Sequence, residues 1–249
     1  MPLGTLLVTG GSRGIGAAIS RLGARQGYAV AVNYHSHEHA AQALVKEIKQ
    51  SGGFAAAIQA DIGRERDILN LFKNAEEELG PVSALVNNAA ITGGFGRVES
   101  VDAAMLERLM AVNVTGAILC AREAVRRLST AHGGKGGAIV NISSRAAKLG
   151  SSGEWVHYAM TKGAIDSLTV GLAREVAKEG IRVNAVAPGL VQTDIHLEAG
   201  DPNRAARLAL TVPLGRAGTP EEIAEGVIWL LSPAASYVTG TILAIGGGR

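Results

Sequence analysis

A tyrosine and a lysine stand four positions apart in the stretch YAMTK, as Tyr158 and Lys162. On an α-helix this spacing places both side chains on one face, so the phenol and the ammonium can lie side by side. Such a phenol can exchange a proton with a substrate if its pKa falls from about 10 to about 7, which requires roughly 4 kcal/mol of preferential phenolate stabilisation. Ordinary surface pairs on helices share this spacing, so the rest of the sequence must distinguish the two interpretations.

A second stretch suited to chemistry is the glycine-rich TGGSRGIG at residues 9–16, which follows an apolar run. Its glycines allow a sharp turn and a close approach of the backbone to a pyrophosphate at the amino end of a helix. The three-residue first spacer differs from G-x-G-x-x-G, and the absence of a G-K-[ST] sequence argues against an ATP or GTP enzyme. The loop predicts a dinucleotide site that includes Gly10, Ser12, Arg13, Gly14, Ile15 and Gly16.

The end of the second expected strand bears on the choice of cofactor. An NAD site carries Asp or Glu there to hold the ribose 2′-hydroxyl, whereas this chain has Asn33, Tyr34, His35 and Ser36. Arg13 could supply a cation for a 2′-phosphate and Ser36 a hydrogen bond, although Arg13 could also be a solvated surface cation. We therefore predict that NADP(H) is preferred over NAD(H).

Short β-branched runs alternate with amphipathic segments along the whole chain, without a Pro/Ser-rich linker or an internal repeat. This pattern predicts one domain over residues 1–249, with an α/β Rossmann-type, doubly wound parallel sheet of about seven strands and helices on both faces. We expect strands at 5–10, 29–34, 55–60, 84–88, 137–143, 181–187 and 241–246, and helices at about 14–26, 37–51, 65–79, 102–131, 158–179 and 220–231.

Composition and charge exclude several classes of protein. The 249 residues are 47% hydrophobic with 33 glycines, and the net charge of +2 comes from mixed basic and acidic residues rather than from a nucleic-acid arm or a membrane-surface helix. Cys120 is the one cysteine, so no internal disulfide is expected, and no apolar run approaches the roughly 20 residues of a membrane span. The amino terminus also lacks a signal-peptide pattern. We expect a cytoplasmic protein with small-molecule partners, no nucleic acid and no membrane.

Six motifs, in order along the chain, resemble those of the short-chain dehydrogenase/reductase family, which includes 3-oxoacyl-carrier-protein reductases and glucose dehydrogenases. They are TGGSRGIG, NNAA (87–90), MAVNVTG with Asn113, NISS (141–144), Tyr158-x-x-x-Lys162 and PGLVQT (188–193). The resemblance implies a catalytic tetrad of Asn113, Ser144, Tyr158 and Lys162, and hydride transfer between NADP(H) and a carbonyl or secondary alcohol. It further implies that Tyr158 is the general acid/base, Ser144 bonds the substrate oxygen, Lys162 binds the nicotinamide ribose, and Asn113 holds a relay water.

The same resemblance implies further cofactor contacts and a homotetramer. Asp61 and Ile62 would flank the adenine, while the ribose and nicotinamide would contact Asn88, Ala89, Ala90, Pro188, Gly189, Val191 and Thr193. For Asp61 the alternative is a strand-end cap, and for Asn113 it is the satisfaction of a buried backbone group. Two departures from the family are Ala90, where glycine is usual, and one additional residue before Tyr158. We expect the loop RAAKLGSSGEWVH to bulge, which leaves Ser143 as the alternative to Ser144.

Two segments are expected to line the substrate side, KLGSSGEWVH (148–157) and a lid QTDIHLEAGDPN (192–203). Their signals conflict, because Trp155 suggests an apolar or sugar-stacking wall, Glu154 and His157 add polarity, and Arg145 and Lys148 could attract an acidic substrate or face water. The sequence therefore does not name the substrate. A non-catalytic NADP(H)-binding regulatory protein remains the alternative to an enzyme.

Two charged clusters have simpler interpretations. HSHEH (35–39) lacks the H-E-x-x-H spacing, so we expect no metal site there. Arg122, Arg126 and Arg127 are expected to form a solvated helix face, with an acyl-carrier docking patch as the alternative.

Overall fold

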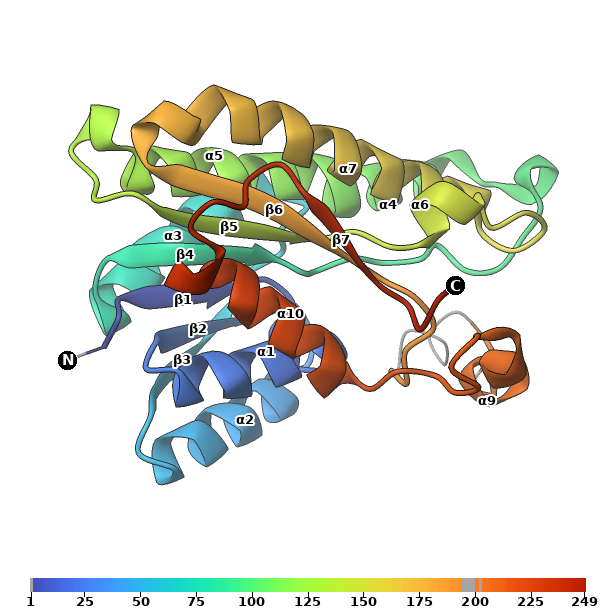
Figure 1. Cartoon of the computed structure of the whole chain (residues 1–249), viewed down its shortest axis with the longest axis horizontal. Coiled ribbons are helices and arrows are strands. Elements are labelled where there is room, and N and C mark those ends of the chain that lie inside the picture. Colours follow the sequence, from blue (N-terminus) through green and yellow to red (C-terminus); the bar gives the residue numbers. More distant parts are fainter. Residues whose placement is uncertain (1, 194–199, 202) are drawn as a thin grey trace.

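The computed structural model of the chain describes residues 2–193, 200–201 and 203–249. At its centre lies a seven-stranded parallel sheet with the strand order β3-β2-β1-β4-β5-β6-β7 (Figure 1). The order reverses between β1 and β4, where doubly wound sheets bind their ligands. This arrangement confirms the predicted fold class, and the strands are Thr5–Val8 (β1), Ala29–Tyr34 (β2), Phe54–Gln59 (β3), Val82–Asn87 (β4), Gly137–Ile142 (β5), Ile181–Pro188 (β6) and Ile242–Ile245 (β7).

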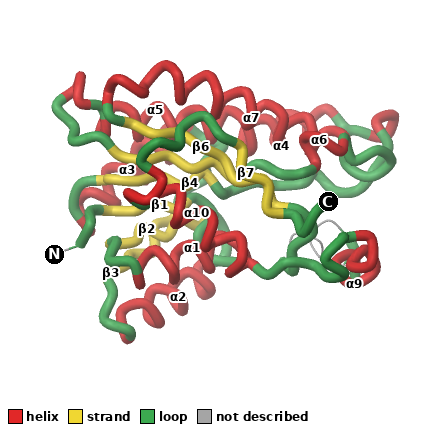
Figure 2. Tube along the Cα trace, in the orientation of Figure 1, coloured by secondary structure: helices red, strands yellow, loops and turns green. Residues whose placement is uncertain are grey.

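Helices cover both faces of the sheet (Figures 1 and 2). Successive residues of a strand point to opposite faces, so Leu6 and Val8 of β1 join one core cluster and Leu7 joins the other. One face carries α1 (Gly14–Arg25), α2 (Glu38–Gln50) and α10 (Pro220–Leu231). The other carries α3 (Glu65–Leu79), α4 (Ala103–Met110), α5 (Ala117–Leu128) and α7 (Val156–Val176).

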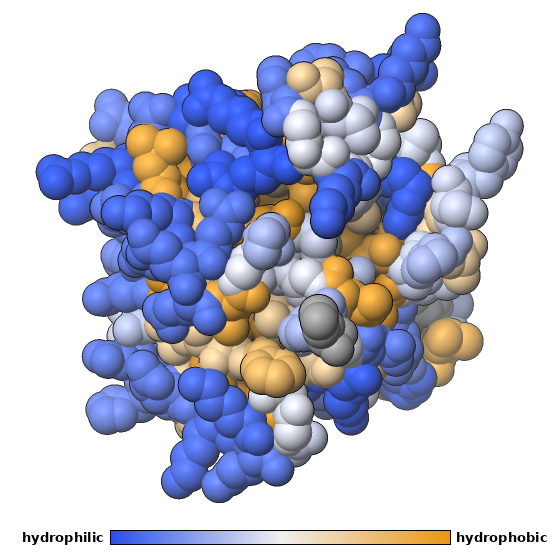
Figure 3. Space-filling model, turned by 90° about the vertical axis from the view of Figure 1, so that its left-hand side faces the viewer, coloured by the Kyte–Doolittle hydropathy of each residue, from blue (hydrophilic) through white to orange (hydrophobic). Residues whose placement is uncertain are grey.

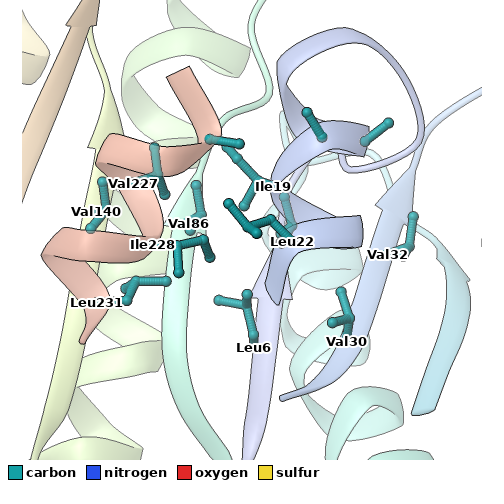
Figure 4. Close-up of a cluster of buried hydrophobic side chains, with 14 of the residues drawn as sticks. Leu6, Ile19, Leu22, Val30, Val32, Val86, Val140, Val227, Ile228 and Leu231 are labelled. Carbon is teal, nitrogen blue, oxygen red and sulfur yellow. The ribbon is translucent and has the colours of Figure 1, made fainter. Parts of the chain in front are cut away.

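Aliphatic side chains from α1 and α10 meet over the central strands (Figure 4). Ile19 and Leu22 of α1 lie near Val227 and Ile228 of α10, and Val86 of β4 lies beneath them. Each fully buried side chain of this kind stabilises the fold by about 1.5–3 kcal/mol. This packing holds α1 in place, and therefore also the glycine-rich loop that precedes it.

The long helix expected at 102–131 is interrupted. A π-helical turn, Ala111–Gly116, joins α4 to α5 and contains the predicted tetrad residue Asn113. The joined run Ala103–Leu128 is long and apolar enough to cross a membrane by length and composition alone, with a mean hydropathy of 1.4. A core helix of a folded domain meets the same test, and α5 packs against β4 and α3.

Two short helices were not expected from the sequence, α6 (Ala146–Leu149) and α9 (Arg204–Leu208). Both lie at the end of the molecule where the strands finish, close to the carboxyl terminus (Figure 1). The opposite end, over the amino ends of the strands, is dominated by hydrophilic side chains, and hydrophobic ones appear mainly in the gaps between them (Figure 3). The carboxyl ends of the strands, where ligands bind in doubly wound sheets, lie at the same end as α6 and α9.

Candidate active site

A cavity of about 850 Å³ opens at the carboxyl ends of the strands. Its size lies within the usual range for small-molecule sites. Every predicted cofactor residue lines it, as do the predicted catalytic residues Ser144, Tyr158 and Lys162, whereas Asn113 lies outside the lining. The fold thus brings together motifs that are spread from residue 10 to residue 193.

The glycine-rich loop has the shape of a phosphate cradle. Gly10 and Gly14 have φ values of +59° and +49°, a region that favours glycine. A Cβ atom on Gly16 would lie 2.2 Å from the carbonyl oxygen of Gly10, so only glycine fits there. The Asn88 amide nitrogen donates to the carbonyl oxygens of Thr9 (2.9 Å) and Gly10 (3.0 Å) and holds the loop in this shape. The amino end of α1, whose first turn has no acidic residue, is therefore open to an anion.

The end of β2 contains one structural and several exposed polar groups. Asn33 is buried, its Oδ1 accepts from the Gly10 N–H (3.1 Å), and its Nδ2 donates to the Ala60 carbonyl (3.1 Å). This side chain therefore ties the glycine-rich loop to the sheet. His35 and Ser36 are exposed at the rim of the cavity, and the Ser36 hydroxyl lies 3.2 Å from His37 Nδ1.

Asp61 forms a bidentate ion pair that sequence reasoning missed. Arg108 of α4 donates to both Asp61 carboxylate oxygens, each at 2.9 Å, and Arg108 also lines the cavity. Burial acts to raise the pKa of Asp61, but hydrogen bonds from Arg108 and from the Gly63 N–H (2.9 Å) outweigh it and hold that pKa below its ordinary value. By accepting from the Gly63 N–H, Asp61 also caps the turn after β3, which is the structural alternative given for it above. The two paired residues are 47 positions apart, and no local spacing links them.

Tyr158 and Lys162 lie on the same face of α7, but their electrostatics differ from the expectation. The Lys162 ammonium donates to the Ile142 carbonyl at the end of β5 (2.7 Å) and lies 5.5 Å from the centroid of the Tyr158 ring. Burial raises the pKa of Tyr158 to about 12, and a hydrogen bond with Ser144 is what acts against it. Lys162 is not among the groups that lower this pKa, so the Tyr-Lys spacing does not by itself bring it near 7.

The reason lies in the burial of both groups. Burial lowers the pKa of Lys162 to about 8, and the Asp166 carboxylate, one helical turn further along α7, acts in the opposite direction. Desolvation disfavours whichever form is charged, so it raises the pKa of a phenol and lowers that of an amine. At neutral pH this leaves Tyr158 protonated, which is the state of a proton donor.

The two neighbouring serines have different surroundings. Ser143 is buried, and its hydroxyl donates to Asp166 Oδ1 at 2.5 Å. Both serines line the cavity, but the Ser144 hydroxyl hydrogen-bonds with Tyr158 and accepts from the Ala146 N–H (3.1 Å). Because its partner is the phenol and not a buried carboxylate, Ser144 is the better placed of the two to bond a substrate oxygen.

The loop before Tyr158 contains a short helix and a strained turn. It forms α6 and then passes through positive φ values at Gly150 (+75°), Ser151 (+47°) and Gly153 (+74°). Ser151 is the non-glycine residue with positive φ among those described, which marks local backbone strain. The predicted bulge in this loop corresponds to the segment between α6 and α7, which carries these positive φ values.

Asn113 acts as a clamp on the segment that follows β4. Its Oδ1 accepts from the Ile91 N–H (2.9 Å), and its Nδ2 donates to the Ile91 carbonyl (2.8 Å) and to Thr161 Oγ1 (3.1 Å). Two of these bonds satisfy a backbone group, the alternative that the sequence left open. The π-helical turn around Asn113 is of a kind that often occurs at functional sites.

Aromatic rings form the wall on the substrate side. Trp155 stacks on Phe95, with centroids 4.7 Å apart, and lies 5.5 Å from the Tyr158 ring. Arg204 of α9 lies over the Trp155 ring at 4.7 Å and pairs with Glu154 at 2.5 Å. Sequence reasoning identified Trp155 and Glu154 but missed Phe95 and Arg204. Most of the predicted lid at 192–203 lies outside the described residues.

The other candidates for substrate contact have protein partners or lie outside the cavity lining. Arg145 lines the cavity, and its Nε donates to the backbone oxygen of Arg249 (2.8 Å). Lys148 is exposed and lies outside the lining. His157 is buried, and its Nε2 lies 3.0 Å from the Thr92 carbonyl oxygen.

The arginines of α5 and the thiol of Cys120 contact other parts of the fold and lie outside the cavity lining. Arg122, Arg126 and Arg127 all pair with the buried Glu123, so they form a compensated network rather than a basic patch. Burial raises the pKa of Cys120 to about 12, as expected for a core thiol. Among the residues that the structure describes, no group of three His, Cys, Asp or Glu side chains could hold a metal ion.

The chain is similar in sequence to a known family and to several curated proteins. The family model described as Enoyl-(Acyl carrier protein) reductase matches residues 10–249. The chain is 50% identical over 243 residues to "Uncharacterized oxidoreductase YgfF" of Escherichia coli (strain K12), covering 98% of each. It is 38% identical over 249 residues to 3beta-hydroxysteroid dehydrogenase 1 of Eggerthella lenta, covering 98% of this chain and 92% of the relative. It is 35% identical over 244 residues to Glucose 1-dehydrogenase 2 of Bacillus subtilis (strain 168), covering 98% and 93%.

Solved structures resemble the whole chain. A short-chain dehydrogenase/reductase from Serratia marcescens BCRC 10948 has a TM-score of 0.91 and 36% identity, covering 99% of this chain and 98% of that chain. The 3-ketoacyl-(acyl-carrier-protein) reductase from Brucella melitensis complexed with NADH has a TM-score of 0.91 and 30% identity, covering 100% and 98%. A blue fluorescent protein from a metagenomic library in complex with NADPH has a TM-score of 0.88 and 36% identity, covering 99% and 98%.

Proposed function

The chain belongs to the short-chain dehydrogenase/reductase family, and on that premise we propose that it is an NADP(H)-dependent oxidoreductase that interconverts a carbonyl compound and a secondary alcohol. The observation that carries the proposal is the convergence of Ser144, Tyr158 and Lys162 on the cavity that the glycine-rich loop also lines. A phosphate cradle and a proton donor in one cavity are the two requirements of nicotinamide-dependent reduction.

The residues of the cavity fit a dinucleotide. Gly10 and Gly14 adopt positive φ values, and a side chain at Gly16 would collide with the Gly10 carbonyl oxygen. Both features support binding of a diphosphate at the amino end of α1. Asp61 and Ile62 would flank the adenine, Asn88 to Ala90 the ribose, and Lys162 together with residues 188–193 the nicotinamide half. When bound, the cofactor supplies or accepts the hydride, and the chain supplies binding, orientation and the proton.

The proton is assigned to Tyr158. Its phenol is buried and protonated at neutral pH, because its pKa of about 12 lies far above 7. It can therefore donate a proton to an oxygen that becomes negatively charged as the carbonyl is reduced. The Ser144 hydroxyl would hold the same oxygen, and Lys162, whose pKa is about 8, can carry a proton that restores the phenol.

Support for NADP(H) over NAD(H) comes from the end of β2. Its residues carry no carboxylate to repel a 2′-phosphate, His35 and Ser36 stand exposed at the rim, and Arg13 begins the helix beside them. Arg13→Glu should weaken NADPH binding at least tenfold and leave NADH binding within about threefold, because only the former loses a charge-assisted contact. Equal changes for both cofactors in a fluorescence titration would contradict this preference.

The decisive test of the proposed function is NADPH and NADH oxidation over a panel of 3-oxoacyl thioesters, diketones, sugars and aromatic ketones. Turnover should be seen with NADPH and should fall at least 100-fold in Tyr158→Phe, which keeps the ring and removes the proton, while NADPH affinity is retained. NADPH binding without turnover on any panel member would instead favour a cofactor-binding regulatory protein.

We further propose that residues 1–249 act as one domain in a cytoplasmic homotetramer. Apolar side chains are exposed on the helices that family members use for assembly, as at Ile118 on α5 and Met160 on α7. Burial of such residues between copies would be favourable. Light scattering should give the mass of four chains of 25.5 kDa. The mass of one chain would refute this assembly.

A further inference from the structure

The outer end of the cavity holds an ion pair between the buried Arg204 and the half-buried Glu154, which the proposed reaction does not use. Arg204 is only 7% exposed and lies over the faces of Trp155 (4.7 Å) and Phe95 (6.0 Å). Its Nη2 donates to Glu154 Oε2, while its Nε is buried with no hydrogen-bond partner among the described residues. A guanidinium nitrogen left unsatisfied in this way is costly, which makes the arrangement difficult to explain as packing alone.

This ion pair adjoins the reacting end of the cavity. Trp155 contacts both groups, because its ring lies 5.5 Å from Tyr158 on one side and 4.7 Å from the Arg204 guanidinium on the other. Both members of the pair line the cavity together with Trp155. A substrate whose carbonyl reaches Tyr158 would thus extend past Trp155 toward the ion pair.

Both arginines of α9 are paired with carboxylates, while Arg145 and Arg249 line the cavity as well. Glu154 neutralises Arg204, and the other arginine of α9, Arg207, pairs with Asp201 at 2.5 Å. A second carboxylate brought to Arg204 would face the Glu154 carboxylate at close range in a partly dry site, where like charges repel strongly. An uncharged oxygen could accept a hydrogen bond from the guanidinium without this repulsion.

We propose that Glu154 and Arg204 determine substrate specificity by admitting uncharged carbonyl compounds and rejecting those with a carboxylate at the end remote from the carbonyl. Trp155 supplies an apolar part of the lining, Arg204 a hydrogen-bond donor, and Glu154 the repulsion of anions. The inference rests on the proposed function, since it concerns substrates of the same cavity. It adds the substrate class, which neither the motifs nor the family determines.

Two ketones of the same shape test the effect of a negative charge at the remote end of the substrate. Methyl 4-acetylbenzoate and 4-acetylbenzoate share one body and one ketone, and differ in a single negative charge at the remote end. With NADPH, kcat/KM for the ester should exceed that for the acid at least tenfold. In Glu154→Gln the ratio of ester to acid should fall at least tenfold, because the variant keeps the shape and hydrogen-bonding capacity of the side chain and removes its charge.

The chain offers a control variant. Glu99 pairs with Arg97 at 2.6 Å on an exposed surface near the same loops, so Glu99→Gln removes an equivalent ion pair without touching the cavity lining. Its ratio should stay within twofold of the native value. A structural role for the Glu154–Arg204 pair, as a tie between α9 and the loop before α7, would lower activity on both ketones equally and leave the ratio unchanged. That result would overturn the proposal.

Calorimetric titration of both compounds into the NADP⁺-loaded protein provides a measurement that does not depend on turnover. Tighter binding of the ester in the native protein, with the difference lost in Glu154→Gln, would uphold the specificity role even if no reduction occurred and the proposed function failed. Equal affinities in both proteins, or no binding of either compound, would refute the specificity role whether or not other ketones are reduced.

Discussion

Replacement of Ser144 by alanine should lower activity, whereas replacement of Ser143 by alanine should lower stability. The two hydroxyls are adjacent in the chain but bond to different groups, Ser144 to Tyr158 and Ser143 to the Asp166 carboxylate at 2.5 Å. Ser144→Ala removes the donor that would hold the reacting oxygen and leaves the fold intact. Ser143→Ala removes a partner from a buried carboxylate and keeps Ser144, Tyr158 and Lys162 in the cavity lining.

The expected magnitudes follow from these surroundings. Loss of a donor aimed at the reacting oxygen typically lowers kcat by about 100- to 1,000-fold, or about 2.7–4 kcal/mol of transition-state stabilisation. Loss of a partner from a buried polar group costs about 1–3 kcal/mol of unfolding free energy. In a domain of this size each kcal/mol moves Tm by about 2–4 °C, so Ser143→Ala should melt several degrees lower.

The assay measures kcat for NADPH oxidation with the best ketone of the panel, and Tm by circular dichroism, for both variants. We expect Ser144→Ala to lose activity with Tm within about 1 °C of the native value, and Ser143→Ala to retain at least a tenth of the activity with a lowered Tm. The reverse pattern would identify Ser143 as the catalytic serine. Equal losses of activity in the two variants would refute the reasoning that their hydrogen bonds separate their roles.

Two further predictions concern Lys162 and Gly16. Without added cofactor, the folded pKa of Lys162 is about 8 against an ordinary 10.5, so between these values the unfolded state binds more protons and this lysine makes stability rise with pH. Urea titrations from pH 7.5 to 10 should therefore show the native protein gaining about 2 kcal/mol relative to Lys162→Met, and parallel curves would contradict the burial argument. Gly16→Ala should weaken NADPH binding at least tenfold by fluorescence titration, because its Cβ would meet the Gly10 oxygen at 2.2 Å, and unchanged affinity would show that the loop does not cradle the phosphates.

Local patterns in the sequence determined the fold and most of the site. The strands follow from short β-branched runs and the helices from apolar periodicity, both of which depend on neighbouring residues. The phosphate loop depends on glycines at defined positions, and the shared face of Tyr158 and Lys162 depends on the helical repeat. The doubly wound topology then brings the carboxyl ends of the strands together, so residues far apart in the chain line one cavity.

Only the tertiary structure decided how the polar groups pair. The Asp61 carboxylate meets Arg108, Lys162 donates to the Ile142 carbonyl, and Arg204 lies over Trp155, and each of these contacts joins different elements of the fold. The same holds for the pKa of Tyr158, which the Tyr-Lys spacing leaves open and which burial raises to about 12. Spacing along a helix determines which side chains are neighbours on it. Burial, and the partners that other elements bring, determine the charge those side chains carry and the bonds they form.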